Sequence, residues 1–236
     1  MDFITDSLPL YINGALYTLL ITVGGCALAF VIAMSVGILG TLRSRVARAV
    51  ASIYVEVFRG VAALVLMFWM FYAMPLVTGY LLDPVFAAIL ALGLNVGAYG
   101  AENVRGAIKA VPAAQYEATI ALNFTPAQRL RSVILPQAWA QMLPTFGNLI
   151  IELMKGSAVV SLIAVSDLTF VGDQVRAFTG QTLAAYTAAL VMYFLLAQVF
   201  LYFMRMAERS ANRRLGREPL KAKKSTPAVA GAGGAA

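Results

Sequence analysis

Three pairs of opposite charges share one spacing inside otherwise apolar stretches of the sequence. In each pair an acidic residue precedes a basic one by three positions: Glu56 and Arg59, Glu102 and Arg105, Glu152 and Lys155. Residues three apart on a helix are neighbours, so each pair can form an ion pair. Charges within apolar helices are costly and are by default functional candidates. The pattern indicates binding or movement of charged groups.

The pair Glu152 and Lys155 lies deepest, roughly 20 Å into the apolar stretch 138–163 at 1.5 Å per residue. These two side chains either neutralise each other or receive the two charges of a zwitterionic solute, and both alternatives stay open. Asn95, in another apolar stretch, is a further candidate for lining a solute path. For the other two pairs the favoured interpretation is structural: the charges either form an ion pair or extend along the helix to the membrane interface.

Covalent catalysis has little support in this sequence. The chain has no histidine, which is the commonest general base and metal ligand, and its one cysteine is Cys26. No disulfide or zinc cage can therefore form within the chain, and no metal site is expected. No Gly-x-x-x-x-Gly-Lys-Ser/Thr loop is present to hold nucleotide phosphates. We expect neither an enzyme nor a bound cofactor in this chain.

The elements that must position these residues are membrane-spanning helices. Of 236 residues, 61% are hydrophobic and 12% are charged, against roughly 25% charged in a soluble domain. A bilayer-spanning helix needs about 20 apolar residues. Five stretches satisfy this: 14–41, 50–74, 84–104, 138–163 and 183–204. The predicted fold class is an all-α integral membrane protein with about five transmembrane helices.

Orientation follows from the basic residues, which accumulate in cytoplasmic connections. They cluster after the first, third and fifth stretches: Arg43, Arg45, Arg48, Arg105, Lys109, Arg129, Arg131 and the run from Arg205 to Lys224. The N-terminus is therefore predicted outside and the C-terminus in the cytoplasm. Three parts are expected: an external segment 1–13, a membrane domain 14–209, and a disordered cytoplasmic tail 210–236. The same distribution explains the net charge of +7 without nucleic acid.

The cytoplasmic connection 105–137 is too polar to span the bilayer and longer than the topology needs. Pro112 is expected to open one helix over 113–122, since proline is well tolerated at a first helical position. Thr125 and Pro126 then provide an N-cap and a first-turn proline for a second helix, which we expect to end at Pro136. Two short helices at an angle on the membrane surface form a candidate docking element.

This connection resembles the cytoplasmic motif of permease subunits of binding-protein-dependent ABC importers. That motif reads Glu-Ala-Ala, three residues, Gly, nine residues, Ile-x-Leu-Pro. The sequence has identical spacing, and its matching residues are Glu117-Ala118-Thr119, Asn123 and Val133-Ile134-Leu135-Pro136. Thr119, Asn123 and Val133 depart from the pattern, although asparagine tolerates the left-handed conformation of a turn glycine.

The resemblance extends from about Asn13 to Arg209. The runs Tyr54–Gly60 and Ala98–Gly106 are similar to the polar-amino-acid (histidine and glutamine) branch of these permeases, with Val61-Ala62 in place of the usual Thr-Pro. Within that branch, 91–105 and 152–170 most resemble permeases for ectoine and hydroxyectoine.

The resemblance implies partners and a mechanism. A cytoplasmic ATPase subunit would bind ATP and Mg²⁺, a second permease subunit would complete the pathway in the bilayer, and an extracytoplasmic binding protein would deliver the solute. Glu117, Ala118, Thr119, Asn123, Leu135 and Pro136 would couple this chain to the ATPase. The expected location is the bacterial inner membrane. An ion-gradient-driven secondary transporter is the alternative; such proteins often contain internal repeats, and none is evident here. A membrane enzyme and a purely structural subunit have less support.

Overall fold

The computed structural model describes residues 2–214, and in that part of the chain every regular element is helical. The α-helices are α1 Asp2–Leu39, α2 Arg45–Gly60, α3 Ala63–Phe68, α4 Met74–Thr78, α5 Pro84–Lys109, α6 Ala113–Ala121, α7 Pro126–Arg129, α8 Leu135–Gly156, α9 Leu168–Thr179 and α10 Thr182–Arg214. Two π-helical turns, η1 Trp69–Ala73 and η2 Leu130–Ile134, and a 3₁₀ segment, η3 Ser157–Ile163, connect some of them.

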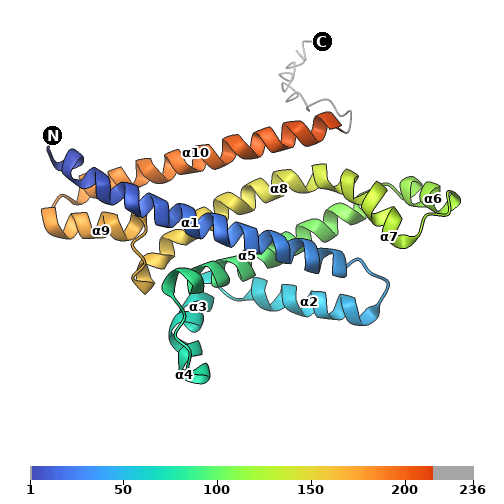
Figure 1. Cartoon of the computed structure of the whole chain (residues 1–236), viewed down its shortest axis with the longest axis horizontal. Coiled ribbons are helices and arrows are strands. Elements are labelled where there is room, and N and C mark those ends of the chain that lie inside the picture. Colours follow the sequence, from blue (N-terminus) through green and yellow to red (C-terminus); the bar gives the residue numbers. More distant parts are fainter. Residues whose placement is uncertain (1, 215–236) are drawn as a thin grey trace, which may run out of the picture.

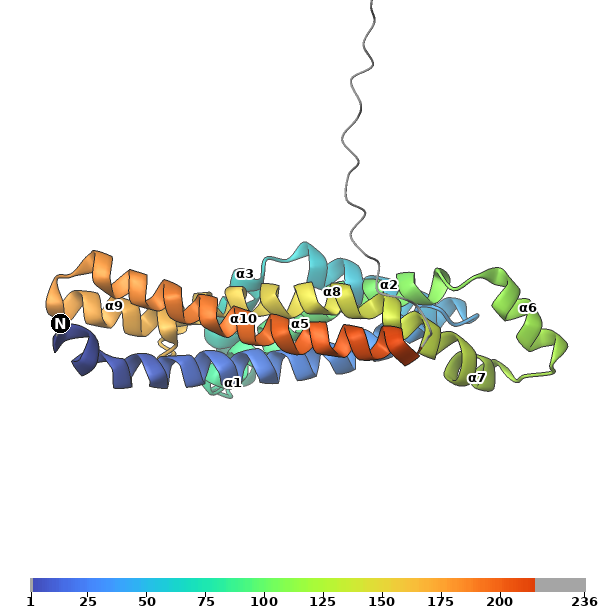
Figure 2. The ribbon, with the colours of Figure 1, turned by 90° about the horizontal axis from the view of Figure 1, so that it is seen from above.

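The long helices α1, α5, α8 and α10 run along one common axis and form an elongated bundle (Figures 1 and 2). The N-terminus of α1 and the short helix α9 lie at one end of this bundle. Helices α6 and α7 project from the opposite end, where α1 turns into α2 (Figure 1). The predicted docking element and the N-terminus are therefore separated by the full length of the bundle.

Within residues 2–214, four helical runs are long and apolar enough to cross a membrane. They are Ser7–Leu39, Pro84–Lys109, Pro126–Ile163 and Thr182–Ala211. A fifth qualifies if Arg45–Gly60 and Ala63–Thr78, which are bent by 97° at a short break, count as one span. The all-α membrane fold with about five spans is confirmed, and the predicted second span over 50–74 contains this break.

The break in the second span is stabilised by the Asn95 side chain of α5, and a further hydrogen bond joins α2 to α5 nearby. Val61, in extended conformation (φ −96°, ψ 132°), ends α2, so the last carbonyls of that helix lack intrahelical donors. The Asn95 amide donates to the carbonyls of Phe58 (2.7 Å) and Val61 (3.0 Å). The Tyr54 hydroxyl donates to the Leu94 carbonyl at 2.8 Å. A polar backbone in lipid needs such partners, and here they allow the chain to turn through 97°.

Helices α1 and α5 pack closely because glycines of α5 face α1. A Cβ added to Gly100 would lie 2.7 Å from the Cβ of Ala33, and one added to Gly93 would lie 2.7 Å from Leu28. A Cβ on Gly37 of α1 would lie 2.6 Å from Val104. Small residues four apart favour such close approach in membranes, so the small-residue faces in the first and third stretches are helix-packing faces.

The helix that begins at Pro126 does not end at Pro136 as predicted. It continues through the π-helical turn η2 into α8, and Pro136 lies in the first turn of α8. Proline needs no hydrogen-bond acceptor for its nitrogen, so a first-turn position costs little. The predicted external segment 1–13 is helical from Asp2 and continuous with the first span. Of the predicted tail 210–236, residues 210–214 belong to α10 and the others lie outside the described residues.

Candidate functional site

The projecting element α6–α7 is a tight helical hairpin with well-formed ends. Asn123 has φ 57°, the left-handed conformation expected from its place in the motif. The Thr125 hydroxyl caps α7 by accepting from the Gln128 N–H at 3.3 Å, and the Gln128 side chain accepts from the Thr125 N–H at 3.0 Å. This reciprocal pair is a capping box. The turn geometry inferred from the sequence is therefore present.

The motif residues divide into an outer surface and an anchor. Glu117, Ala118 and Asn123 are exposed, and so is Pro136. Thr119 is 2% exposed, and its hydroxyl donates to the Tyr116 carbonyl at 2.7 Å. Its position explains why a small residue is required there. Glu117 is thus available to a partner, whereas Thr119 supports the helix from within.

An apolar cluster fastens this hairpin to the bundle. Ile134 of η2, Ile108 of α5 and Val111 are buried in one cluster, against which Tyr116 and Leu135 pack. The Tyr116 hydroxyl also donates to the Ile108 carbonyl at 3.1 Å. Burial raises the pKa of Tyr116 above its usual value, and the nearby charge of Arg129 partly opposes this. The hairpin is therefore anchored on α5 and on the turn that leads into α8.

Of the three charge pairs, the structure forms one as an ion pair. The Arg105 guanidinium donates to Glu102 through Nε (3.0 Å) and Nη2 (2.6 Å). Glu56 and Arg59 form no ion pair in the described part of the chain; the Arg59 guanidinium lies over the Tyr99 ring, 5.1 Å from its centroid. A cation over an aromatic face is electrostatically attracted. An ion pair is therefore formed on α5 and not on α2 in the described residues.

Glu152 and Lys155 do not pair with each other in the residues described. Both are exposed, on a helix that otherwise crosses the bilayer. Asn148 lies one turn before Glu152 on the same helix, and Thr145 lies two turns before it. Both are exposed, so a polar stripe runs along α8. Lipid does not solvate such a stripe, because exposed polar groups in hydrocarbon cost free energy. The stripe therefore faces water, solute or another protein.

Asn95, the third residue assigned to the solute path, lies elsewhere. It is 8% exposed, and its amide group is engaged by the break in the second span. The structure does not bring Asn95 together with Glu152 and Lys155.

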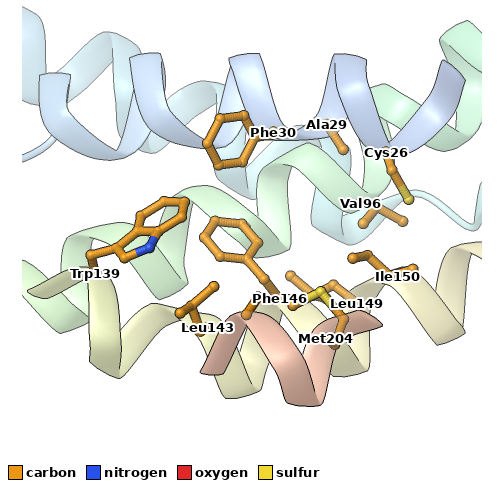
Figure 3. Close-up of a pocket in the computed structure, with 12 residues that line it drawn as sticks. Cys26, Ala29, Phe30, Val96, Trp139, Leu143, Phe146, Leu149, Ile150 and Met204 are labelled. Atoms are coloured by element: carbon orange, nitrogen blue, oxygen red, sulfur yellow. The ribbon is translucent and has the colours of Figure 1, made fainter. Parts of the chain in front are cut away.

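An apolar cavity of about 270 Å³ lies inside the bundle between α1, α5, α8 and α10 (Figure 3). Phe30, Trp139 and Phe146 form its aromatic wall, and Cys26 lies at its edge (Figure 3). The residues that line it carry no charge, so it offers no partner for either end of a zwitterion. The cavity is an open, apolar hollow among the helices, and its lining does not include the polar residues of the α8 stripe.

A buried polar cluster at the α9 end was missed in the sequence. Asp167 is fully buried and accepts from the N–H groups of Phe170 (3.0 Å) and Thr169 (3.2 Å) and from the Tyr193 hydroxyl (2.9 Å). Thr18 of α1 accepts from the Leu168 N–H at 3.3 Å. The cluster joins α1, α9 and α10. Aspartate directly before an apolar helical run is an N-cap signal and could have identified it.

Within residues 2–214 no three Asp, Glu or Cys side chains come together as a metal site would require. The site that the structure defines is thus a docking hairpin at one end and a polar stripe on a spanning helix.

Comparisons with known proteins identify this architecture. Residues 29–213 match the family described as the binding-protein-dependent transport system inner membrane component. The chain belongs to this family, and is a permease subunit of an ABC transporter located in the inner membrane.

Several relatives of this chain are named for amino-acid transport. A probable amino-acid ABC transporter permease of Sinorhizobium fredii is 48% identical over 70% of this chain and 71% of its own length. The glutamine transport system permease protein GlnP of Escherichia coli is 34% identical over 87% of this chain and 94% of its own. A solved amino acid ABC transporter with histidines aligns with TM-score 0.80 and 31% identity over 89% of this chain and 99% of that one. These relatives belong to amino-acid transport systems, and this chain is similar to them in sequence and fold.

Proposed function

We propose that this permease subunit carries a polar amino acid or a similar zwitterion such as ectoine or hydroxyectoine inward. The observation that supports the proposal is the exposed polar stripe of α8, in which Glu152 and Lys155 lie on one helix without pairing to each other. A carboxylate and an ammonium left free in this way match the opposite charges of a zwitterion. The relatives described above are named for amino acids, and ectoine rests on sequence resemblance alone.

The hairpin α6–α7 is proposed as the coupling element to a cytoplasmic ATPase subunit. Glu117 would accept charge-assisted hydrogen bonds from that subunit, because it is exposed near the middle of α6. Ala118 and Asn123 would shape the contact surface, Thr119 would support it from within, and Leu135 and Pro136 would transmit its movement to α8. ATP and Mg²⁺ are assigned to the ATPase subunit and not to this chain.

The proposed orientation places α6–α7 in the cytoplasm and the N-terminus with α9 outside. Basic residues of the α1–α2 turn lie at the α6–α7 end, and Asp167 and Asp173 belong to the opposite end (Figure 1). This distribution agrees with the rule that positive charges remain inside.

A second permease subunit, of the same or a related sequence, would cover the polar stripe of α8 and complete the pathway. A binding protein would deliver solute at the α9 end. ATP binding would draw the coupling hairpins together and open the pathway outward, and hydrolysis would return it inward. This chain changes the side of the membrane to which the pathway is open, and it makes or breaks no covalent bond.

The test is uptake into proteoliposomes holding the complete transporter and its binding protein. Glutamine, histidine, arginine and ectoine are supplied separately. Glu152→Gln is expected to lower uptake of the preferred solute about tenfold to a hundredfold, because a hydrogen bond to a charged group contributes about 1.5–3 kcal/mol. Glu56→Gln serves as a control, because it makes the same change at an exposed carboxylate of α2 that forms no ion pair among the described residues. Uptake by Glu152→Gln equal to that of the native complex would refute the role of Glu152.

The same assay decides the energy source. Uptake that persists without ATP and collapses with an ionophore would support the secondary-transporter alternative instead.

A further inference from the structure

A small positively charged recess lies between α1, α2 and α5, at the α6–α7 end of the bundle. Its volume is about 130 Å³, which suits a group of several heavy atoms because one water takes up roughly 30 Å³ in the liquid. Three cationic side chains from two helices line it: Arg48 of α2, and Arg105 and Lys109 of α5. Glu102 is the one acidic residue among those that line it.

The charges in the recess do not cancel. Glu102 is engaged by Arg105 through two hydrogen bonds of 3.0 and 2.6 Å. Among the described residues, neither Arg48 nor Lys109 forms an ion pair. Two positive charges therefore remain for an external anion. The Arg105 guanidinium, 40% exposed in its ion pair, is held in a fixed position at the wall of the site.

Small residues keep the recess open. Gly37 of α1 and Gly40, which directly follows α1, line one side of the recess, and a Cβ on Gly40 would lie 3.3 Å from Cδ of Arg105. Ala51 and Ser52 form the wall contributed by α2, and the Ser52 hydroxyl is exposed. The site is concave, and the Ser52 hydroxyl adds a hydrogen-bond donor to the two free cations. Two cations, a hydroxyl donor and this size suit a phosphate group.

We propose that this recess binds the phosphate of an anionic phospholipid headgroup. The outer face of α2 shows why the anion comes from a lipid: Val46, Val50 and Ile53 are 74%, 54% and 62% exposed along it. A spanning helix with an apolar outer face lies against acyl chains, so headgroups gather at the end of α2 that carries Arg48. Basic pockets between spans on the cytoplasmic side suit anionic headgroups. The proposal rests on the orientation given above.

The experiment measures lipid retained by the full chain in its purified transporter complex. The complex is placed in nanodiscs of phosphatidylcholine containing a minor fraction of phosphatidylglycerol, released, and analysed by native mass spectrometry. Arg48→Gln with Lys109→Gln is expected to reduce bound phosphatidylglycerol about thirtyfold, since each basic residue near an anionic surface contributes roughly fivefold. Arg205→Gln with Arg209→Gln, on the exposed end of α10, removes the same charge and is expected to leave retention unchanged.

A third variant separates the recess from surface charge. Ser52→Leu fills the recess while keeping all three cations, and it is also expected to abolish retention. Thermal unfolding confirms that each variant is folded.

Four results would overturn the proposal. If the α10 control loses as much bound lipid as the double variant, the effect comes from net positive charge and not from the recess. If Ser52→Leu still retains the lipid, the recess is not the binding site. Displacement of the lipid by millimolar inorganic phosphate would make a soluble anion the ligand. Loss of the ATPase subunit from the double variant, with lipid retained, would mean that an acidic protein surface occupies the recess. Loss of transport with native lipid binding would bear on the proposed function and leave this inference intact.

Discussion

At the scale of single residues, close helix packing depends on glycines whose replacement has calculable consequences. Gly100→Ala places a Cβ 2.7 Å from that of Ala33, so α1 must shift. Overpacking of this kind costs about 1–3 kcal/mol. Gly106→Ala in the same helix meets nothing within 4 Å and is expected to be neutral or stabilising by up to about 1 kcal/mol, since alanine favours helix. Thermal unfolding midpoints in detergent measure the effect of each substitution. Equal midpoints for Gly100→Ala and Gly106→Ala would contradict the packing of α1 against α5.

Asp167 predicts a pH dependence with a definite sign. Burial raises its pKa above the ordinary value of 3.8, and hydrogen bonds from the Phe170 N–H and the Tyr193 hydroxyl partly oppose this. The folded state therefore holds the proton more tightly than the unfolded chain does, so this residue's contribution to stability is greatest below pH 3.8 and declines as pH rises through the raised pKa.

Unfolding midpoints measured from pH 4 upward are compared for the native chain and Asp167→Asn. The advantage of the native chain over the variant should shrink as pH increases. An advantage that grows with pH would show that hydrogen bonding outweighs burial at this carboxyl.

At the scale of elements, the coupling hairpin depends on one left-handed residue. Asn123 has φ 57°, which costs an ordinary side chain about 1–2 kcal/mol and a β-branched one more. Asn123→Val is expected to distort the turn and weaken association with the ATPase several-fold, whereas Asn123→Gly is expected to preserve it. Pull-down of the ATPase with each variant measures the difference. Equal weakening by both would indicate that the Asn123 side chain itself makes the contact.

Sequence reasoning succeeded where local rules decide the structure. The N-cap at Thr125 and the left-handed turn at Asn123 follow from side-chain chemistry over a few positions. It failed where distant residues decide. The break after Gly60 depends on Asn95, some 35 residues along the chain. Its amide donates to backbone carbonyls at the end of α2 that have no partner within the helix. Pro136 looked like a helix end because the π-helical turn before it is not evident from composition.

At the scale of the whole molecule, the bundle connects two regions that the sequence suggested separately. The hairpin α6–α7 packs on α5 and α8, and α8 carries the polar stripe with Glu152 and Lys155. Movement at the docking end can therefore reach the stripe through one continuous helix, Pro126–Ile163. The family and the number of spans were accessible from the sequence. The partner of Arg59 and the buried position of Asn95 were not, since both depend on how α2 meets α5.

The central claim is that this permease couples to an ATPase through Glu117. Its most direct test is affinity purification of the full chain, mildly solubilised from its own membranes, with identification of the co-purifying proteins. Glu117→Arg is compared with Glu208→Arg, which makes the same charge change on α10. We predict that an ATPase co-purifies with the native chain and with Glu208→Arg and is lost with Glu117→Arg. Absence of an ATPase from the native chain, or its full retention by Glu117→Arg, would contradict the claim.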